Sequence, residues 1–434
     1  MNDKTEIQYG QYVVPQGYEM VNFGVGQPSN KLLPLNIVMK GLYENLEITN
    51  PALLQYGDIP GYLQFRESLA KYLEFKYNNP VSPKNLFVVN GVTGGLALIC
   101  SLLTKTGATI YVEEPTYFLA INIFKEFNLT IVPIPIHQDG VDIDKLEDYL
   151  KEDNSNESKL FYTIPTFHNP TSYTMSEVKR QKLGELTNKY NLVVVSDEVY
   201  QLLYFDDQDK PPKPLCYYGE NIISIGSFSK ILAPSLRLGW IQTSPKYIKI
   251  LSDSAQLDSS GGMNPLISSI VHKIIDNGDQ DMHIQFIREE LKNRCYRLSD
   301  EINKYLLDYV DYVKPTGGYF IWLKLKNKVD AVELLKLAEN NKVKFHGGIR
   351  FSSCNELNNY LRLSFSYYST EDLELGIKRL QETFKKYYDI RNSINVNILG
   401  FKGRLGSKIV EALKESEYSK KYRFNQGIDR NMEF

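Results

Sequence analysis

Short runs of apolar residues that alternate with longer helical patterns constrain this fold most. Four of these runs lie at residues 85–90, 160–164, 192–196 and 222–226. Apolar runs of this length predict strands buried on both faces. Helical patterns lie between them, for example at residues 177–190. This alternation predicts an α/β fold, with a large domain built on a mostly parallel sheet flanked by helices.

Composition excludes several classes of protein. The chain has 434 residues, which at roughly 150 residues per domain suggests two or three domains. A net charge of −2 provides no basic field for nucleic acid and no polybasic face for a membrane. No apolar run approaches the ~18 residues of a membrane span, and the polar N-terminus does not resemble a secretory signal. Four widely spaced cysteines show no metal or redox spacing, so we expect a cytoplasmic protein without a bound metal.

The segment at residues 227–240 combines hydroxyls, an amine and a guanidinium directly after an apolar run. Ser227 and Arg237 suit a phosphate, and Lys230 suits attack on a carbonyl. A solvated surface lysine is the alternative. This segment resembles the cofactor-lysine signature of class I and II aminotransferases, the fold type I enzymes that use pyridoxal 5′-phosphate. The resemblance implies that Lys230 binds the cofactor covalently and moves the substrate proton, while Ser227 and Arg237 hold the phosphate.

Asp197 follows an apolar strand, where a carboxylate is poorly solvated and needs a partner. A protonated pyridine nitrogen would be that partner, and its positive charge stabilises a carbanion. The alternative is an N-cap for the following turn. The resemblance places Asn169 and Tyr200 beside the phenolic oxygen of the cofactor, although Asn169 before a proline is also a common turn. We interpret His168 as a loop histidine.

A glycine-rich loop at residues 91–95 precedes an apolar helix expected at residues 96–103. A strand, a glycine loop and a helix N-terminus together form an anion site, although a tight turn is the simpler interpretation. The resemblance implies that Val92 and Thr93 donate hydrogen bonds to the cofactor phosphate. The resemblance also implies that Tyr117 stacks on the pyridine ring, in place of a role in the core.

Two further positions concern the substrate. Arg362 lies in an alternating apolar strand, where an arginine is costly to bury without an anion. The resemblance implies that Arg362 binds the substrate α-carboxylate, and an internal salt bridge is the alternative. Gly26 lies in a turn-like segment where the backbone would approach that carboxylate closely. Residues 346–348 depart from the proline and glycine that the family carries there.

The resemblance also implies a homodimer with shared active sites, in which Tyr56 contacts the partner's cofactor phosphate. We expect an N-terminal arm with a small-domain contribution at residues 1–50 and a large cofactor domain at residues 51–262. Residues 263–390 would form an interdomain helix, unbroken from about 265 to 306, and a smaller α+β domain.

The tail at residues 391–434 differs from the rest. Its sequence predicts a strand at 395–399, a glycine turn at 400–406 and a helix at 407–413. This order is typical of dinucleotide-binding folds. It resembles the opening of dihydrodipicolinate reductase, with residues 427–430 on an expected second strand. Because one such unit cannot bury both faces of its sheet, we interpret the tail as a truncated Rossmann-like fusion.

The resulting hypothesis is a pyridoxal-phosphate-dependent aminotransferase. It would move the amino group of an L-amino acid to a 2-oxo acid such as 2-oxoglutarate, in the branch of 2-aminoadipate and aromatic aminotransferases. A carbon–sulfur lyase of the same fold and a diaminopimelate or lysine-pathway aminotransferase are alternatives. A cofactor-sensing regulatory module is the non-enzyme alternative, but the sequence offers it no DNA-binding region.

Overall fold

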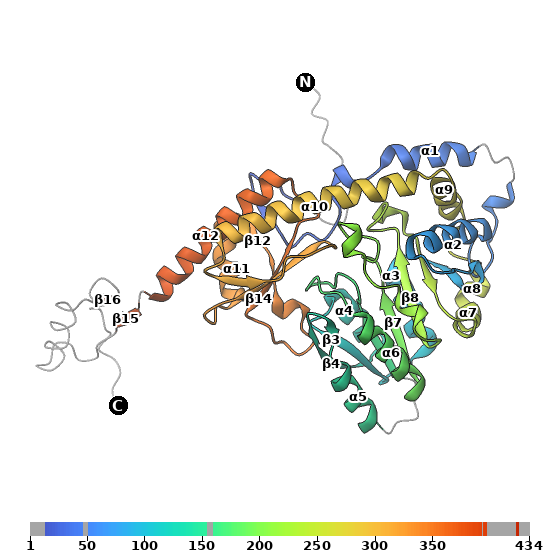
Figure 1. Cartoon of the computed structure of the whole chain (residues 1–434), viewed down its shortest axis with the longest axis horizontal. Helices are drawn as coiled ribbons and strands as arrows, with labels where there is room; N and C mark the ends of the chain where they lie inside the picture. Colours follow the sequence, from blue (N-terminus) through green and yellow to red (C-terminus); the bar gives the residue numbers. More distant parts are fainter. Residues whose placement is uncertain (1–13, 47–50, 154–158, 393, 397–421, 425–434) are drawn as a thin grey trace, which may run out of the picture.

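An eight-stranded sheet forms the frame of the large domain in the computed structural model (Figure 1), with the strand order β2-β9-β8-β7-β6-β3-β4-β5. Strands β8, β7, β6, β3 and β4 are parallel neighbours, while β9 and β5 run antiparallel to the strands beside them. The strands span Leu86–Val89 (β2), Thr109–Glu114 (β3), Thr130–His137 (β4), Gly140–Val141 (β5), Lys159–Thr163 (β6), Leu192–Asp197 (β7), Ile222–Ser227 (β8) and Gly239–Gln242 (β9). The structure describes residues 14–46, 51–153, 159–392, 394–396 and 422–424.

Helices cover both faces of this sheet, as the alternation of patterns predicted. Successive strand residues point to opposite faces, so Phe161 joins one apolar cluster and Tyr162 joins the other. Helices α5 and α6 pack over the first cluster, and α3 and α4 pack over the second. The helices of this domain are Leu63–Tyr77 (α2), Gly91–Leu103 (α3), Phe118–Glu126 (α4), Ile143–Glu152 (α5), Glu177–Lys189 (α6), Pro245–Ser252 (α7) and Ala255–Ser260 (α8).

A smaller antiparallel sheet, in the order β10-β11-β14-β13, forms the second domain. The N-terminal segment joins this domain, because β1 pairs in parallel with β12. The elements of this part are Val21–Asn22 (β1), Val310–Tyr312 (β10), Phe320–Leu325 (β11), Ala331–Asn340 (α11), Val343–Lys344 (β12), His346–Gly347 (β13), Tyr360–Ser364 (β14) and Thr370–Asn392 (α12). The predicted fold class, a large mostly parallel domain with a smaller second domain, is confirmed, while the domain limits stay predictions.

The connection between the two sheets corrects one expectation. The unbroken helix expected from 265 to 306 is wrong, since the structure has α9 (Pro265–Asp276) and α10 (Asp279–Tyr305). Gly278 adopts a positive φ of 75° between them, a conformation that ends a helix and that glycine adopts without strain. Figure 1 shows α10 running from α9 in the large domain to α12 in the small one, while α1 (Leu35–Leu46) lies beside α9.

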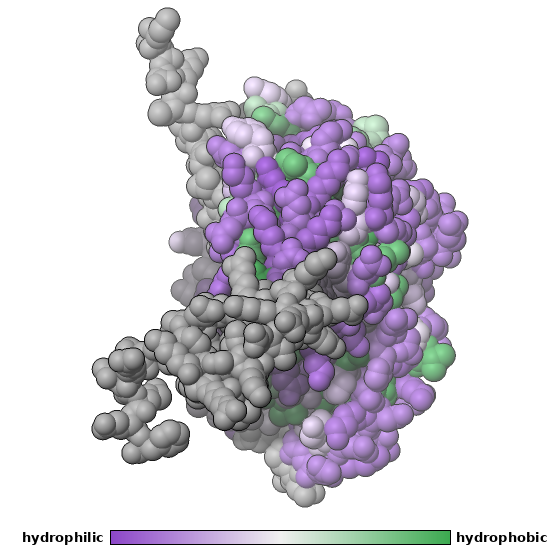
Figure 2. All heavy atoms as spheres, turned by 90° about the vertical axis from the view of Figure 1, so that its left-hand side faces the viewer, coloured by the Kyte–Doolittle hydropathy of each residue, from purple (hydrophilic) through white to green (hydrophobic). Residues whose placement is uncertain are grey.

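Figure 2 shows that the described surface on the side of the small domain is mostly hydrophilic, with apolar residues scattered over it. None of the helices among the described residues is long and apolar enough to cross a bilayer.

In the tail, β15 (Ile394–Val396) pairs in parallel with β16 (Tyr422–Phe424). The glycine turn and helix expected at 400–413, and the strand expected at 427–430, lie outside the described residues.

Candidate active site

The predicted site residues gather where the parallel strands of the large sheet end. Asp197 and Ser227 are the last residues of β7 and β8. Tyr117 follows β3, and Asn169 follows β6. The carboxyl ends of parallel strands lie at one edge of a sheet, and ligands of open α/β folds bind there.

The N-terminus of α3 and Arg237 form one end of this region. The helix begins at Gly91, so the glycines expected in a loop lie in its first five residues, with Val92 and Thr93. Free backbone N–H groups of a first turn attract anions. Arg237 has a φ of 46° and donates from Nη2 to the Asn90 carbonyl at 2.9 Å. A Cβ on Gly91 would lie 3.0 Å from that same nitrogen, so glycine lets the guanidinium approach the helix N-terminus.

Two serines lie next to this end of the region, since Ser227 pairs in register with Gly239, whose added Cβ would lie 2.9 Å from Gly91 Cα. The Ser227 hydroxyl donates to Ser229 Oγ at 2.9 Å and accepts from the Ser229 N–H at 3.1 Å. Ser227 is buried, whereas Arg237 is exposed. The predicted phosphate-binding residues therefore come from two neighbouring structures, namely the end of β8 with its following turn and the start of α3.

Asp197 is a buried carboxylate, 4% exposed. It accepts from the Tyr162 hydroxyl at 3.0 Å and from the Val199 N–H at 3.4 Å. The second bond is the contact that the capping alternative expects, because residues 199–202 form a turn. Burial raises the pKa of Asp197 to about 7. Among the described residues no basic side chain forms an ion pair with it, so a cationic ring nitrogen would supply the charge that this carboxylate lacks.

Lys230 is not a solvated surface lysine. Its Nζ donates to the Gly26 carbonyl at 2.8 Å and lies 5.3 Å from the centre of the Tyr319 ring. Burial and the positive charge of Arg362 lower the pKa of Lys230 to about 8. A neutral amine is the nucleophilic form, and this environment makes it accessible near neutral pH.

Arg362, 3% exposed, lies on β14 and reaches the large domain. Its Nη1 donates to Asn169 Oδ1 at 2.9 Å, and its Nη2 donates to the Gly24 carbonyl at 2.8 Å. Its buried Nε has no hydrogen-bond partner, and burial lowers the pKa of Arg362 to about 9. Within the described part of the chain no carboxylate pairs with it, so the internal salt bridge is not formed there. A Cβ on Gly26 would lie 3.2 Å from Phe320 and 3.7 Å from Arg362 Nη2.

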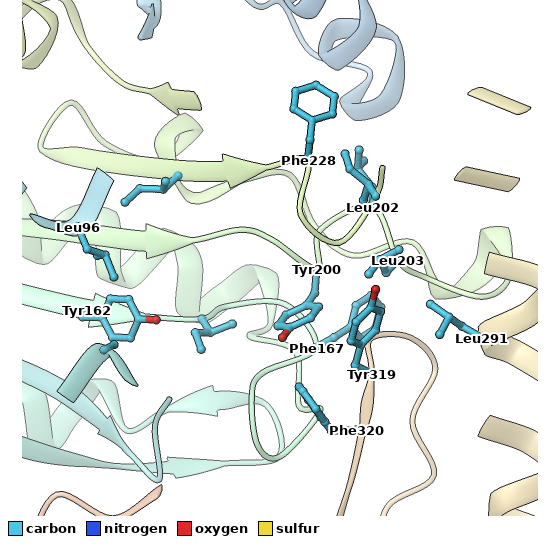
Figure 3. Close-up of a cluster of buried hydrophobic side chains, with 14 of the residues drawn as sticks. Leu96, Tyr162, Phe167, Tyr200, Leu202, Leu203, Phe228, Leu291, Tyr319 and Phe320 are labelled. Carbon is cyan, nitrogen blue, oxygen red and sulfur yellow. The ribbon is translucent and has the colours of Figure 1, made fainter. Parts of the chain in front are cut away.

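Aromatic side chains line the same region. Tyr200 is buried, and its ring lies 5.7 Å from Tyr319 and 6.0 Å from Phe320. Figure 3 shows these three rings together, with Tyr200 projecting from the large domain and the other two from the strand segment of the small domain. Tyr117 lies at the start of α4, with its ring 5.5 Å from Phe118.

Tyr56 does not join this set within one chain. Its side chain is 81% exposed, although its loop is held in place by the hydrogen bond from the Gly262 N–H to the Gly57 carbonyl at 3.0 Å. An exposed tyrosine on a held loop can contact a second molecule.

Sequence reasoning missed the residues that support this site. His168, interpreted as a loop histidine, is 2% exposed. Its Nε2 lies 3.2 Å from Glu113 Oε2, and its Nδ1 lies 2.9 Å from Thr171 Oγ1. Arg180 is fully buried and donates to three backbone carbonyls and to Thr166 Oγ1, which secures the loop that carries Asn169. One sequence signal could have indicated this support: Glu113 is an acidic residue near the end of an apolar strand, as Asp197 is.

The donor set fits pyridoxal phosphate. The cofactor would need a carboxylate for its ring nitrogen, an amine for its aldehyde and an anion site for its phosphate. The unpaired buried Asp197, the half-buried Lys230 and the α3 N-terminus with Arg237 offer these three groups at one edge of the sheet.

Comparisons with known proteins agree with this chemistry. The family model of class I and II aminotransferases matches residues 18–380. Aromatic-amino-acid aminotransferase 1 of Thermococcus litoralis is 33% identical over 85% of this chain and 88% of its own length. The kynurenine aminotransferase of Pyrococcus horikoshii, solved with PMP, has a TM-score of 0.79 at 31% identity and covers 85% of this chain and 91% of the other. LysN, the alpha-aminoadipate aminotransferase of Thermus thermophilus, was solved with N-(5′-phosphopyridoxyl)-L-leucine. It has a TM-score of 0.76 at 25% identity over 86% of this chain and 94% of the other.

Proposed function

Because the chain belongs to the class I and II aminotransferases, enzymes that use pyridoxal 5′-phosphate, we propose that Lys230 holds this cofactor and moves the proton during amino transfer. The observation that carries the proposal is the position of the Lys230 amine. It donates to the Gly26 carbonyl at 2.8 Å, and a Cβ on Gly26 would lie 3.7 Å from Arg362 Nη2. The charges of Arg362 and Asp197 also shift the pKa of Lys230 in opposite directions. One of these side chains would hold the substrate and the other the cofactor ring.

The roles of the other residues follow from their chemistry. Pyridoxal phosphate, when bound, draws electrons away from the substrate α-carbon. We assign Asp197 to keep the ring nitrogen protonated, with Asn169 and Tyr200 near the phenolic oxygen and Tyr117 against the ring. Val92, Thr93, Ser227 and Arg237 would bind the phosphate.

Substrate handling would fall to Arg362, Gly26 and Lys230. The unsatisfied Nε of Arg362 and its planar fork suit an α-carboxylate. Gly26 lets the backbone pass close to that group. Lys230 would take the proton from the α-carbon as a base and, as an acid, deliver it to the cofactor carbon that carries the aldehyde, an effect typically of ~10²–10⁴ in rate.

We propose that the amino donors are aromatic and 2-aminoadipate-like L-amino acids, and that 2-oxoglutarate is an acceptor. The names of the relatives support these classes. Two aromatic rings beside Arg362 also support these classes. The Arg362 guanidinium lies 4.0 Å from the centre of the Phe320 ring and 4.9 Å from that of Phe351.

A panel of amino donors with 2-oxoglutarate tests this function. We expect glutamate to form from 2-oxoglutarate, and Lys230→Ala to abolish both turnover and the absorbance of the lysine-bound cofactor. Formation of pyruvate and ammonia in place of glutamate would identify the lyase alternative. Turnover by Lys230→Ala at the wild-type rate would refute the assignment. Diaminopimelate belongs in the panel, because its selective use would favour the lysine-pathway alternative.

We propose that the enzyme is a homodimer. Large apolar side chains are exposed around Tyr56 at Leu54, Leu63 and Leu266, with 77%, 43% and 41% exposure, and a second copy would bury them. Light scattering should give twice the chain mass, and Tyr56→Phe should weaken cofactor binding. A fully active monomer would contradict the dimer. We also propose a cytoplasmic location, which the four free cysteine thiols support.

A further inference from the structure

The loop that departs from the family pattern lies next to Arg362. Strand β13 pairs with β14 so that His346 is the partner of Arg362 in register. The ring of His346 lies 5.8 Å from that of Phe118 and 6.2 Å from that of Phe351. A Cβ on Gly24 would lie 2.9 Å from His346 Cε1, so glycine makes room for the imidazole. The segment at residues 346–351 therefore forms a wall of the candidate site.

Arg350 follows on this wall, in the short helical turn Gly348–Phe351. Its guanidinium lies 4.2 Å from the centre of the Phe118 ring, and its Nη1 lies 3.5 Å from His346 Nδ1. Its side chain is exposed. In the part of the chain that the structure describes, no carboxylate pairs with Arg350, whereas the neighbouring Lys344 pairs with Glu339 at 2.9 Å.

His346 cannot balance this charge. Burial and the positive charges of Arg362, Arg350 and Lys344 lower the pKa of His346 to about 2, so the ring is neutral at any physiological pH. A neutral imidazole can accept a hydrogen bond at Nδ1 from Arg350. His346 therefore orients the guanidinium and contributes no further positive charge.

Arg350 and Arg362 thus lie close enough for the charge of one to act on the other, and among the described residues no carboxylate pairs with either of them. The rings of Phe118 and Phe351 link them, because these rings lie 5.4 Å apart and each carries one arginine. The charge of Arg350 also lowers the pKa of Arg362, so the two groups repel each other. A ligand with one carboxylate relieves this repulsion at Arg362 only, whereas a ligand with two carboxylates relieves it at both.

We propose that Arg350 binds the distal carboxylate of dicarboxylic substrates while Arg362 binds their α-carboxylate. This inference rests on the proposed function, since it names the substrate class of the same site. Contact with Phe118 lets the Arg350 side chain lie flat when the substrate has an apolar side chain, which would let one site accept both substrate classes.

Calorimetry with unreactive acids tests this without turnover. The holoenzyme is titrated with glutarate and with pentanoate, which have the same carbon chain and differ by one carboxylate. We expect at least about 10-fold tighter binding of glutarate, as for one charge-assisted hydrogen bond at an exposed site. Arg350→Gln should bring the ratio of the two dissociation constants close to 1. Lys344→Gln removes a positive charge beside this wall, from the end of β12, and should keep the wild-type ratio.

Equal affinities for the two acids in the wild type would overturn the inference, and so would an unchanged ratio in Arg350→Gln. An equal loss in both variants would also overturn it, because it would indicate a diffuse electrostatic effect. In transamination assays the ratio of kcat/KM for glutamate to that for norleucine should fall about 10-fold in Arg350→Gln. A protein that prefers glutarate but transfers no amino group would refute the proposed function alone.

Discussion

Replacing Asp197 by asparagine should stabilise the cofactor-free protein while it destroys the activity. Burial raises the pKa of this carboxyl from 3.8 to about 7, so between these values the folded state binds more protons than the unfolded state. The free energy of unfolding therefore falls as the pH rises through this window, by about 1.4 kcal/mol per pH unit. At pH 8 the ionised Asp197 costs up to about 4 kcal/mol.

Asparagine avoids this cost, because it stays neutral and still accepts a hydrogen bond from Tyr162. Its unpaired amide N–H groups cost about 1–3 kcal/mol in return. The net gain in the cofactor-free protein at pH 8 should therefore be about 1–3 kcal/mol. Because only the wild type titrates, the difference between the two proteins should grow by about 3 kcal/mol from pH 5 to pH 8.

Urea unfolding of both cofactor-free proteins at pH 5, 6, 7 and 8 measures this difference. With the cofactor the order should reverse, because loss of one partner of a buried charge pair costs about 3–5 kcal/mol. Transamination should fall by about 100-fold or more. A variant that is less stable than the wild type at pH 8, or a difference that does not change with pH, would refute the reasoning.

Three further predictions concern single side chains. Arg362→Ala should raise KM by about 10–100-fold for every α-amino acid tested, and an effect confined to one class of side chain would contradict its role. Arg180→Met should lower the free energy of unfolding by about 3–5 kcal/mol, because three carbonyls, two of them buried, lose their donor. A loss below about 1 kcal/mol in urea unfolding would refute this. Covalent capture of the cofactor by Lys230 should accelerate with pH with a midpoint near pH 8 and level off about one pH unit above it. A stopped-flow midpoint near pH 10 would show an ordinary lysine.

The elements with uniform patterns were predictable, and those decided by single residues were not. Apolar runs located the strands of the large sheet, since burial on both faces leaves no other pattern. The helix break at Gly278 was missed, because an amphipathic pattern on both sides of a glycine also fits one continuous helix. The start of α3 at Gly91 was missed for a related reason, since glycines are rare in helices but tolerated in a first turn.

The candidate site likewise contains some residues that the sequence indicates and others that it does not. Asp197, Lys230 and Arg362 could be named as candidates because each places a charge in or directly after an apolar strand, and the structure brings them to one region, while their roles stay predictions. The residues that hold them could not be named, because their contacts depend on register between distant segments. The Tyr162 hydroxyl meets Asp197 across 35 positions of the sequence, and no local pattern around the tyrosine indicates this.

The bond between Arg362 and the Gly24 carbonyl joins residues that are 338 positions apart. At translation rates of about 5–20 residues per second, Gly24 would be synthesised roughly 20–70 s before its partner. Asp197 and Lys230 are made well inside that interval, as is the strand framework around them. On the ribosome, the residues proposed to bind the cofactor are therefore all synthesised before the arginine proposed to bind the amino acid. A nascent chain passes through a stage in which it has the first group without the second.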